Sequence, residues 1–418
     1  MGRRPLATGG NRRRGLSEDT HKPATRLVEV GRRKQWTRVE GQPGGVVNPP
    51  VWRSSTHLYD STADLAQGRP NADGHFYYGR RGGPTQWALA EALTALEPGA
   101  DGTELFPSGV AAISCTLMAL LRPGDELLFA DNAYEPTRTA ALGLLKRFDI
   151  SARAFDPLDV DGFAQAIGPA TKLVMLENPG SLTMEVCDIP ALTAIAREKG
   201  VLSVIDNTWA SPLGFPALER GCDVSVMSLT KHVGGHSDLM MGSASAKQPL
   251  IERIRNHAQF LGQVVSPDDA ALALRGLRTM GVRLEQSTKS ALAVADWLQS
   301  RSEVASVLCP MLPGAPGYDI WQRDFSGGCG LFSFTLRDAD VRARARFLDS
   351  LELFGIGFSW GGYESLAIPV DPARVRDFNA WPSDADAGSG LGVRLSIGLE
   401  DPGDLIRDLT RAFAAMET

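Results

Sequence analysis

The run Ser228–Leu229–Thr230–Lys231–His232–Val233–Gly234–Gly235–His236 directly follows a predicted strand and carries a lysine between hydroxyl side chains. A lysine amine in this position can form a Schiff base with a carbonyl compound, while the hydroxyls of Ser228 and Thr230 bind a phosphate. Taken alone, the run fits a strand-end lysine that faces solvent better than it fits a reactive one. The interpretation therefore depends on what else the chain places at strand ends.

A carboxylate lies at the end of an earlier predicted strand. Asp206 follows Val201–Ile205 directly and begins Asp206–Asn207–Thr208–Trp209. An aspartate there is often a turn-former or a helix cap. A strand-end aspartate followed by a strand-end lysine is more specific, because the carboxylate can pair with a protonated pyridine nitrogen and keep that ring an electron sink. Asp206 and Lys231 together favour a site for pyridoxal 5'-phosphate (PLP).

Two further segments could complete such a site. In Ser108–Gly109–Val110–Ala111–Ala112 a turn of small residues opens a predicted helix, whose first N–H groups can bind a phosphate. A simple N-cap by Ser108 explains the same residues. Tyr134 follows the predicted strand Glu126–Ala130 and could stack on a cofactor ring, although an aromatic residue in this place is as often part of the core.

Arginines suited to anions occur in two contrasting settings. The polar loop Tyr77–Tyr78–Gly79–Arg80–Arg81–Gly82–Gly83–Pro84–Thr85 can recognise an anion or can be a solvated basic turn. Arg394 instead lies inside the apolar strand Gly392–Gly398. A buried arginine needs a carboxylate partner, which an amino-acid substrate or a protein acidic group can provide.

These residues require a framework that brings strand ends together. Four runs are almost continuously apolar, as expected for strands covered on both faces: Glu126–Ala130, Lys172–Leu176, Val201–Ile205 and Asp223–Ser228. Helical periodicity lies among them in Gly109–Leu121, Pro136–Arg147 and Ile189–Lys199. This alternation predicts a mostly parallel α/β sheet with right-handed crossovers, on which ligands collect at the carboxyl ends of the strands.

After Ser266 the pattern predicts a second, smaller α/β domain. Its expected parts are an amphipathic helical stretch over Asp268–Arg301 interrupted near Gly276 and Gly281, a strand at Gly330–Leu336, a helix at Asp340–Leu351 and a strand near Val393–Ile397. Residues 369–392, rich in Pro, Asp, Gly and Ser, are predicted to be the only long irregular segment.

The bulk composition is that of a folded protein of about two domains, with 418 residues, 43% hydrophobic and 22% charged. A net charge of −6 argues against general nucleic-acid binding. No apolar stretch approaches the roughly 20 residues of a membrane span. Five scattered cysteines without metal-site spacing predict buried thiols, a reducing, cytoplasmic setting and no metal site. The basic first 34 residues lack a secretory apolar core and are expected to form a solvated leader, with a transit peptide or an RNA-binding arm as alternatives.

From about Thr25 to Phe413, the order of these runs resembles the Cys/Met-metabolism family of PLP enzymes. The resemblance implies the aspartate-aminotransferase fold, fold type I, with a mostly parallel seven-stranded sheet in a large domain and a smaller C-terminal α/β domain. It also implies three parts: residues 1–81 as leader and N-terminal segment, 82–277 as the PLP-binding domain, and 278–418 as the small domain. The matching phrases fit the bacterial cystathionine β-lyase branch; besides Tyr78–Gly82 they are Asn178–Pro179–Gly180–Ser181, Thr183–Met184–Glu185–Val186, Asp206–Asn207–Thr208–Trp209–Ala210 and Ser359–Trp360–Gly361–Gly362–Tyr363–Glu364–Ser365.

The resemblance assigns a role to each matching residue. Lys231 is expected to bind PLP covalently and move the Cα proton, Asp206 to pair with the ring nitrogen, and Tyr134 to stack on the ring. The phosphate is expected to meet Gly109, Val110, Ser228 and Thr230, with Tyr78 and Arg80 reaching it from a neighbouring subunit of a homotetramer. The expected substrate-binding residues are Arg394 and Ser359 at the α-carboxylate and Arg81 and Trp360 toward the distal end of the substrate, together with Tyr78 and Phe358.

The reaction implied by this branch is α,β-elimination of L-cystathionine to homocysteine, pyruvate and ammonia, with Tyr134 or Lys231 giving the leaving sulfur its proton. Phe358 stands where γ-acting relatives typically carry glutamate and where the best-matching lyases carry tyrosine. The alternatives are a γ-acting enzyme and a lyase for other cysteine conjugates. A non-catalytic protein is disfavoured because Lys231, Asp206 and Arg394 are all present, and a nicotinamide dehydrogenase because no GxGxxG opens a helix after the first strand.

Overall fold

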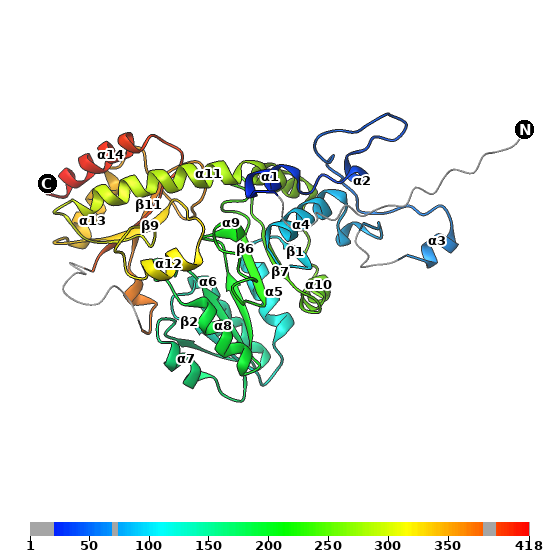
Figure 1. The fold of residues 1–418 in the computed structure, drawn as a ribbon, viewed down its shortest axis with the longest axis horizontal. Helices are drawn as coiled ribbons and strands as arrows, with labels where there is room; N and C mark the ends of the chain where they lie inside the picture. The colour runs from blue at the N-terminus through cyan, green and yellow to red at the C-terminus, as the bar shows by residue number, and fades with distance from the viewer. Residues whose placement is uncertain (1–20, 69–73, 379–389, 418) are drawn as a thin grey trace, which may run out of the picture.

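The computed structural model describes residues 21–68, 74–378 and 390–417 and contains two sheets (Figure 1). The larger sheet has seven strands, and helices cover both of its faces. The smaller sheet has five strands and lies with the C-terminal helices at the far side of the molecule from the N-terminal segment (Figure 1). The long helix α11 runs along one side of the structure and links the two regions.

In the large sheet, one antiparallel strand interrupts an otherwise parallel arrangement. The spatial order is β1 (Gly102–Phe106), β7 (Gly242–Ala246), β6 (Val224–Ser228), β5 (Leu202–Asp206), β4 (Thr171–Glu177), β2 (Glu126–Ala130) and β3 (Ser151–Phe155). β7 pairs antiparallel with β1 and with β6, and the pairs from β6 to β3 are parallel. The prediction of a mostly parallel seven-stranded sheet is confirmed.

Burial on both faces explains why the predicted strands are almost continuously apolar. In β4, Leu173 and Met175 belong to one core cluster, whereas Val174 and Leu176 belong to the other. Successive side chains of a strand point to opposite faces, so each face needs its own apolar residues. The first cluster packs under α5 (Gly109–Leu120) and α10 (Leu250–Phe260), and the second under α4 (Pro84–Leu96) and α8 (Ile189–Glu198).

The predicted helix over Pro136–Arg147 is not one regular helix. It consists of α6 (Glu135–Thr139), a π turn (Ala140–Leu144) and a 3₁₀ turn (Leu145–Phe148). The remaining crossover helices are short, namely α7 (Val160–Ala166) and α9 (Ser211–Gly214). Apolar spacing alone does not distinguish these three helical forms, because all of them bury one side of the chain at similar intervals.

The small sheet confirms the second α/β region. Its order is β10 (Gly355–Ile356), β11 (Leu366–Val370), β12 (Gly392–Ser396), β9 (Leu331–Leu336) and β8 (Val304–Leu308). β12 is central and antiparallel to both neighbours. The helices of this region are α12 (Tyr318–Asp324), α13 (Val341–Asp349) and α14 (Pro402–Ala414).

α11 (Pro267–Gln299) is continuous, so the interruption predicted at Gly276 and Gly281 is wrong. A Cβ at Gly276 would overlap the carbonyl oxygens of Val233 and Gly234, and one at Gly281 would press on Leu27. These glycines therefore allow close packing inside a regular helix. The proposed boundary between residues 277 and 278 falls within α11, which packs against α4 at one end and against β8 and α14 at the other.

The N-terminal part also differs from expectation. Before residue 21 the predicted leader lies outside the described residues, but α1 (Pro23–Glu29) and α2 (Lys34–Thr37) are packed, with Leu27, Val30 and Trp36 buried. Beyond α2 and before α3 (Thr62–Ala66), residues 38–61 have isolated bridges as their only strand pairing. Residues 369–392 are thus not the only long irregular segment, and β11 extends into them; residues 379–389 lie outside the description.

The five cysteines are all buried and form no disulfide, as predicted. Across residues 21–68, 74–378 and 390–417, no helix combines the length and the apolar character that crossing a membrane requires.

Candidate active site

Lys231 lies in the turn after β6, where it meets a loop of the small domain. Its Nζ donates a hydrogen bond of 2.7 Å to Ser359 Oγ and lies 5.5 Å from the centre of the Trp360 ring. The turn is closed by the Lys231 amide on Ser228 O and by the Gly235 amide on Lys231 O. Burial, with the nearby positive charge of Arg394, lowers the pKa of Lys231 to about 8, so the amine is easily neutralised.

Asp206 ends β5 and is buried beside the lysine turn. Its Oδ1 accepts hydrogen bonds from the amide of Thr208 at 3.0 Å and from the Thr208 hydroxyl at 2.5 Å. The same hydroxyl accepts from the Ser228 amide at 2.9 Å, which ties the ends of β5 and β6 together. Burial raises the pKa of Asp206, whereas Thr208 and Lys231 oppose that shift. Within the described part of the chain, Asp206 Oδ2 has no hydrogen bond and can accept one.

A cradle for an anion lies at the start of α5. Ser108 caps the helix by accepting from the Ala111 amide at 3.1 Å, which leaves the first amides, of Gly109 and Val110, without a helical acceptor. A Cβ at Gly109 would lie 2.8 Å from Ser228 Cβ, so the helix start and Ser228 approach closely because residue 109 is glycine. Thr230 is bound differently: its hydroxyl accepts from the Met241 amide and donates to the Met241 carbonyl.

Tyr134 lies at the start of α6, in the segment after β2. In the strand order, Asp206 on β5 therefore lies between Lys231, which follows β6, and Tyr134. Its amide donates a 2.6 Å hydrogen bond to Glu177 Oε2, and its side chain is about half exposed. Burial raises the pKa of the Tyr134 hydroxyl, and the negative charge of Asp206 raises it further. The sequence interpretation did not single out Glu177. The available signal was its position: Glu177 is a carboxylate at the end of β4, the strand between β2 and β5.

Arg394 lies on the central strand β12 and points its guanidinium at the Ser359 loop. Its Nη2 donates to the Ser359 carbonyl at 3.0 Å, and burial lowers its pKa to about 10. Among the residues described, no acidic side chain forms an ion pair with Arg394, so the alternative of a structural partner finds no support. Ser359 has φ +94°, a region that non-glycine residues rarely occupy and that is typical of strained functional sites.

The other residues of this loop differ in exposure. Trp360 is partly buried, with its ring 5.2 Å from that of the buried His232 in an edge-to-face arrangement. Phe358 is 90% exposed and contacts no other aromatic ring in the described structure. The loop thus presents Ser359 and Trp360 to Lys231 and leaves Phe358 in solvent.

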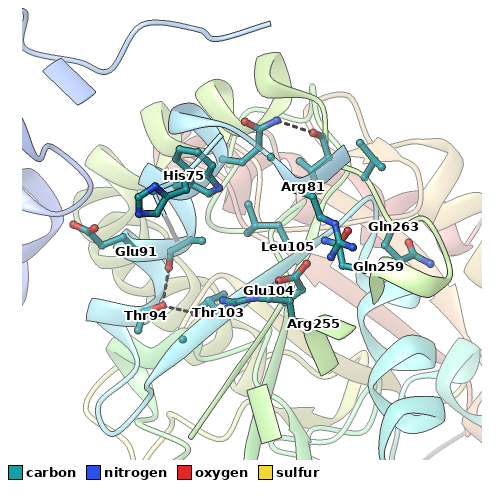
Figure 2. A pocket seen from close by; sticks show the side chains of 18 of the residues that line it. His75, Arg81, Glu91, Thr94, Thr103, Glu104, Leu105, Arg255, Gln259 and Gln263 are labelled. Atoms are coloured by element: carbon teal, nitrogen blue, oxygen red, sulfur yellow. Dashed lines mark hydrogen bonds and ion pairs between the residues drawn. The ribbon is translucent and has the colours of Figure 1, made fainter. Parts of the chain in front are cut away.

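Tyr78, Arg80 and Arg81 are not brought to Lys231 within this chain. Arg80 donates to the Gln259 carbonyl on α10 at 3.1 Å, and Tyr78 is exposed. Arg81 lines a separate pocket of about 400 Å³, where Figure 2 shows it with Glu104 and Arg255, an ion pair at 3.2 Å. Burial and the charge of Arg80 lower the pKa of Arg81.

The group around Lys231 fits PLP on three observations. The amine has a lowered pKa, Asp206 has one oxygen available for a ring N–H, and glycine at position 109 keeps open the approach of helix amides to Ser228. An aldehyde, a pyridine nitrogen and a phosphate are the three groups that these features can hold.

Comparison with known proteins agrees with this fit. Residues 24–414 match the family described as Cys/Met metabolism PLP-dependent enzyme. The chain is 42% identical over 394 residues to cystathionine beta-lyase MetC of Escherichia coli (strain K12), covering 93% of this chain and 98% of that protein. It is 35% identical to cystathionine gamma-synthase of Mycobacterium bovis, with 93% and 96% covered. The crystal structure of MetB from Corynebacterium glutamicum superposes with a TM-score of 0.83 at 30% identity, covering 94% of this chain and 98% of that one. The chain therefore belongs to the Cys/Met metabolism family of PLP-dependent enzymes.

Proposed function

We propose that this enzyme is a carbon–sulfur lyase that cleaves the Cβ–S bond of L-cystathionine and yields homocysteine, pyruvate and ammonia. The observation that carries the proposal is Arg394, a partly buried guanidinium without an acidic partner in the described residues, held by the same serine that contacts the Lys231 amine. This places a carboxylate-binding group beside a base, as an α-amino acid requires. The 42% identical E. coli β-lyase supports the choice of thioether.

When bound, PLP supplies an electron sink for the electron pair released at Cα. Lys231 holds the cofactor and then, as a neutral amine, takes the Cα proton. Asp206 would pair with the ring nitrogen and keep it protonated. Arg394 binds the α-carboxylate and orients the Cα–H bond toward Lys231, while the Ser359 carbonyl fixes the guanidinium.

Tyr134 is suited to protonate the departing sulfur. Its raised pKa keeps the hydroxyl protonated at neutral pH, so it can give a proton but is a poor base. Lys231 is the alternative donor once it carries the proton from Cα. One proton removed from Cα and one given to sulfur balance the elimination, and water completes the release of pyruvate and ammonia.

The loop at Phe358 favours β- over γ-elimination. The γ-acting relatives typically carry glutamate at this place, and the phenyl group of Phe358 offers no carboxylate. It also lacks the hydroxyl of the tyrosine that the best-matching lyases carry. A γ-acting enzyme and a lyase for other cysteine conjugates are the competing functions. Trp360 and Arg81 are proposed to contact the distal part of the substrate.

The remaining proposals concern assembly. We infer that Tyr78 and Arg80 reach the phosphate site of a neighbouring subunit, together with Gly109, Val110, Ser228 and Thr230 of that subunit, in a homotetramer. The exposure of Tyr78 and the separation of this segment from Lys231 within one chain support that arrangement. We retain residues 82–277 and 278–418 as the two domains after the N-terminal segment 1–81. Five buried thiols without disulfides support a reducing compartment such as the cytoplasm.

The test is a product assay on the purified enzyme with PLP. Incubation with L-cystathionine is expected to release pyruvate and homocysteine in equal amounts. Release of 2-oxobutyrate and cysteine would replace the proposal by a γ-lyase, and turnover of other cysteine conjugates at much higher kcat/KM would replace the substrate. The absence of all these products, with PLP bound, would contradict a lyase.

A further inference from the structure

Two carboxylates end neighbouring strands beside the cofactor site. Glu177 ends β4 and Asp206 ends β5, and the two are register partners in the parallel pairing. Register partners direct their side chains to the same face of a sheet. β2, which leads to Tyr134, pairs with β4 on its other side. Glu177 therefore lies between the segment that carries Tyr134 and the carboxylate of Asp206.

Glu177 holds Tyr134 through the backbone. The Tyr134 amide donates to Glu177 Oε2 at 2.6 Å, across 43 positions of sequence. The other bonds of this turn are local, from the Ala133 amide to Ala130 O and from the Thr137 amide to Tyr134 O. The glutamate side chain is thus the contact that fixes the Tyr134 amide to the sheet.

The surroundings decide which carboxylate keeps a proton. Asp206 receives two hydrogen bonds from Thr208 and faces the positive Lys231, and both favour its ionised form. Glu177 accepts a hydrogen bond from the Tyr134 amide and faces Asp206 and Glu185, with the cation of Arg376 also near it. Burial and the charge of Asp206 raise the pKa of Glu177 well above its usual range. Neighbouring acids in such unequal settings titrate apart.

We propose that Glu177 is a positioning residue that holds Tyr134 over the cofactor ring, and that it does so as a neutral acid beside ionised Asp206. The proposal rests on the ring-stacking role of Tyr134 proposed above. The proton on Glu177 takes no part in the reaction itself. It removes a second negative charge from beside Asp206, so that Asp206 can stay ionised for the ring nitrogen.

The test measures PLP binding by the apo-protein in equilibrium dialysis, without turnover. Glu177→Gln keeps a neutral acceptor for the Tyr134 amide and is expected to bind PLP within about twofold of wild type. Glu177→Ala removes the acceptor and is expected to weaken binding about tenfold, or ~1.4 kcal/mol. Equal weakening by Gln and Ala would overturn the neutral acid, and equal affinity in all three proteins would overturn the positioning role.

A double-mutant cycle separates positioning from general damage. Tyr134→Ala removes the ring, so adding Glu177→Ala to it is expected to weaken PLP binding little further. Full additivity would show that Glu177 does not act through Tyr134. The matched control is Glu185→Ala, which removes a partly buried glutamate that accepts a hydrogen bond from Thr183 and none from Tyr134, and which is expected to leave PLP affinity unchanged.

The same cycle distinguishes an error in the role of Glu177 from an error in the proposed stacking role of Tyr134. Unchanged PLP affinity in Tyr134→Ala would remove the stacking role, and the inference with it. A loss in Tyr134→Ala without any loss in Glu177→Ala would leave stacking intact and overturn only the glutamate. The isosteric Gln variant keeps the test usable if Glu177→Ala fails to fold.

Discussion

The carboxyl ends of β4 to β6 and the segment Tyr78–Arg81 both carry side chains suited to an anionic cofactor, yet they are placed in opposite ways. Asp206 and Lys231 converge within one chain, and Arg394 joins them from the small sheet. Arg80 and Arg81 instead face α10 and the separate pocket of Figure 2. The carboxyl ends of parallel strands lie at one edge of the sheet because of the sheet geometry. The position of a segment outside the sheet depends instead on its own contacts.

Under the assembly proposed above, the site has a part that is complete in one chain and a part that a second chain would complete. Substitutions in the first part are expected to damage each subunit independently. Those in the second are expected to be repaired by a partner. The predictions that follow run from the largest expected effect to the smallest.

Lys231→Ala is expected to lower pyruvate formation from L-cystathionine by about 10³-fold or more, because both the covalent anchor and the base are lost. The visible absorbance of lysine-bound PLP is expected to disappear as well. Lys247→Ala is the control: Lys247 also follows a strand of the large sheet, but β7 is antiparallel and ends at the opposite edge. Similar losses in both variants would break the assignment to this edge.

Arg394→Ala is expected to lower kcat/KM about 10²-fold, since a buried carboxylate of the substrate is left unpaired. The kcat/KM of Arg394→Lys is expected to lie between those of wild type and Arg394→Ala, because lysine keeps the charge but lacks the planar guanidinium. Steady-state kinetics with L-cystathionine measure both, with the exposed Arg374→Ala as control. If kcat/KM were unchanged in Arg394→Ala, the substrate carboxylate would be bound elsewhere.

Gly276→Ala is expected to lower the free energy of unfolding by about 1–3 kcal/mol, because its Cβ overlaps backbone oxygens of the turn behind Lys231. Gly143→Ala, with open space around its Cβ, is the matched control. Urea unfolding of the two apo-proteins gives the comparison. Equal stability would mean that α11 and the lysine turn can move apart at little cost, and that the close packing at Gly276 does not fix the position of the turn.

Arg80→Ala is expected to weaken PLP binding about tenfold, as for a lost bond to a charged group. Its sharper test is mixing with Lys231→Ala under conditions of subunit exchange. If Arg80 serves the neighbouring site, each mixed dimer contains one intact site, and about a quarter of all sites recover wild-type PLP affinity and activity at low PLP concentration. A mixture without any sites of wild-type PLP affinity would place Arg80 in its own subunit's site.

The rate of PLP binding to apo-protein is expected to rise with pH through about 8, the lowered pKa of Lys231. The neutral amine is the nucleophile, so its fraction increases about fivefold from pH 7 to pH 8 and levels off above that. Stopped-flow absorbance measures the rate. A midpoint near the usual lysine value, above pH 10, would show that burial and Arg394 do not act on this amine.

Much of the fold was predictable because its signals are local. The four apolar runs became β2, β4, β5 and β6 within a residue or two, since strands buried on both faces need continuous apolar sequence. The weaker strands β1, β3 and β7 were not assigned individually. Ser151–Phe155 has exposed positions, and Gly242–Ala246 is made of small residues, so neither has a strong apolar pattern.

The sequence by itself determined which residues carry chemistry and on which strands they lie, because residue type and apolar spacing are properties of short stretches of chain. Only the tertiary structure decided that Arg394 has no acidic partner among the described residues, that Glu177 holds the Tyr134 amide, and that Arg80 lies away from Lys231. Each of these depends on contacts between residues far apart in sequence and on burial, which sets whether a charged group is paired, neutral or available to a ligand.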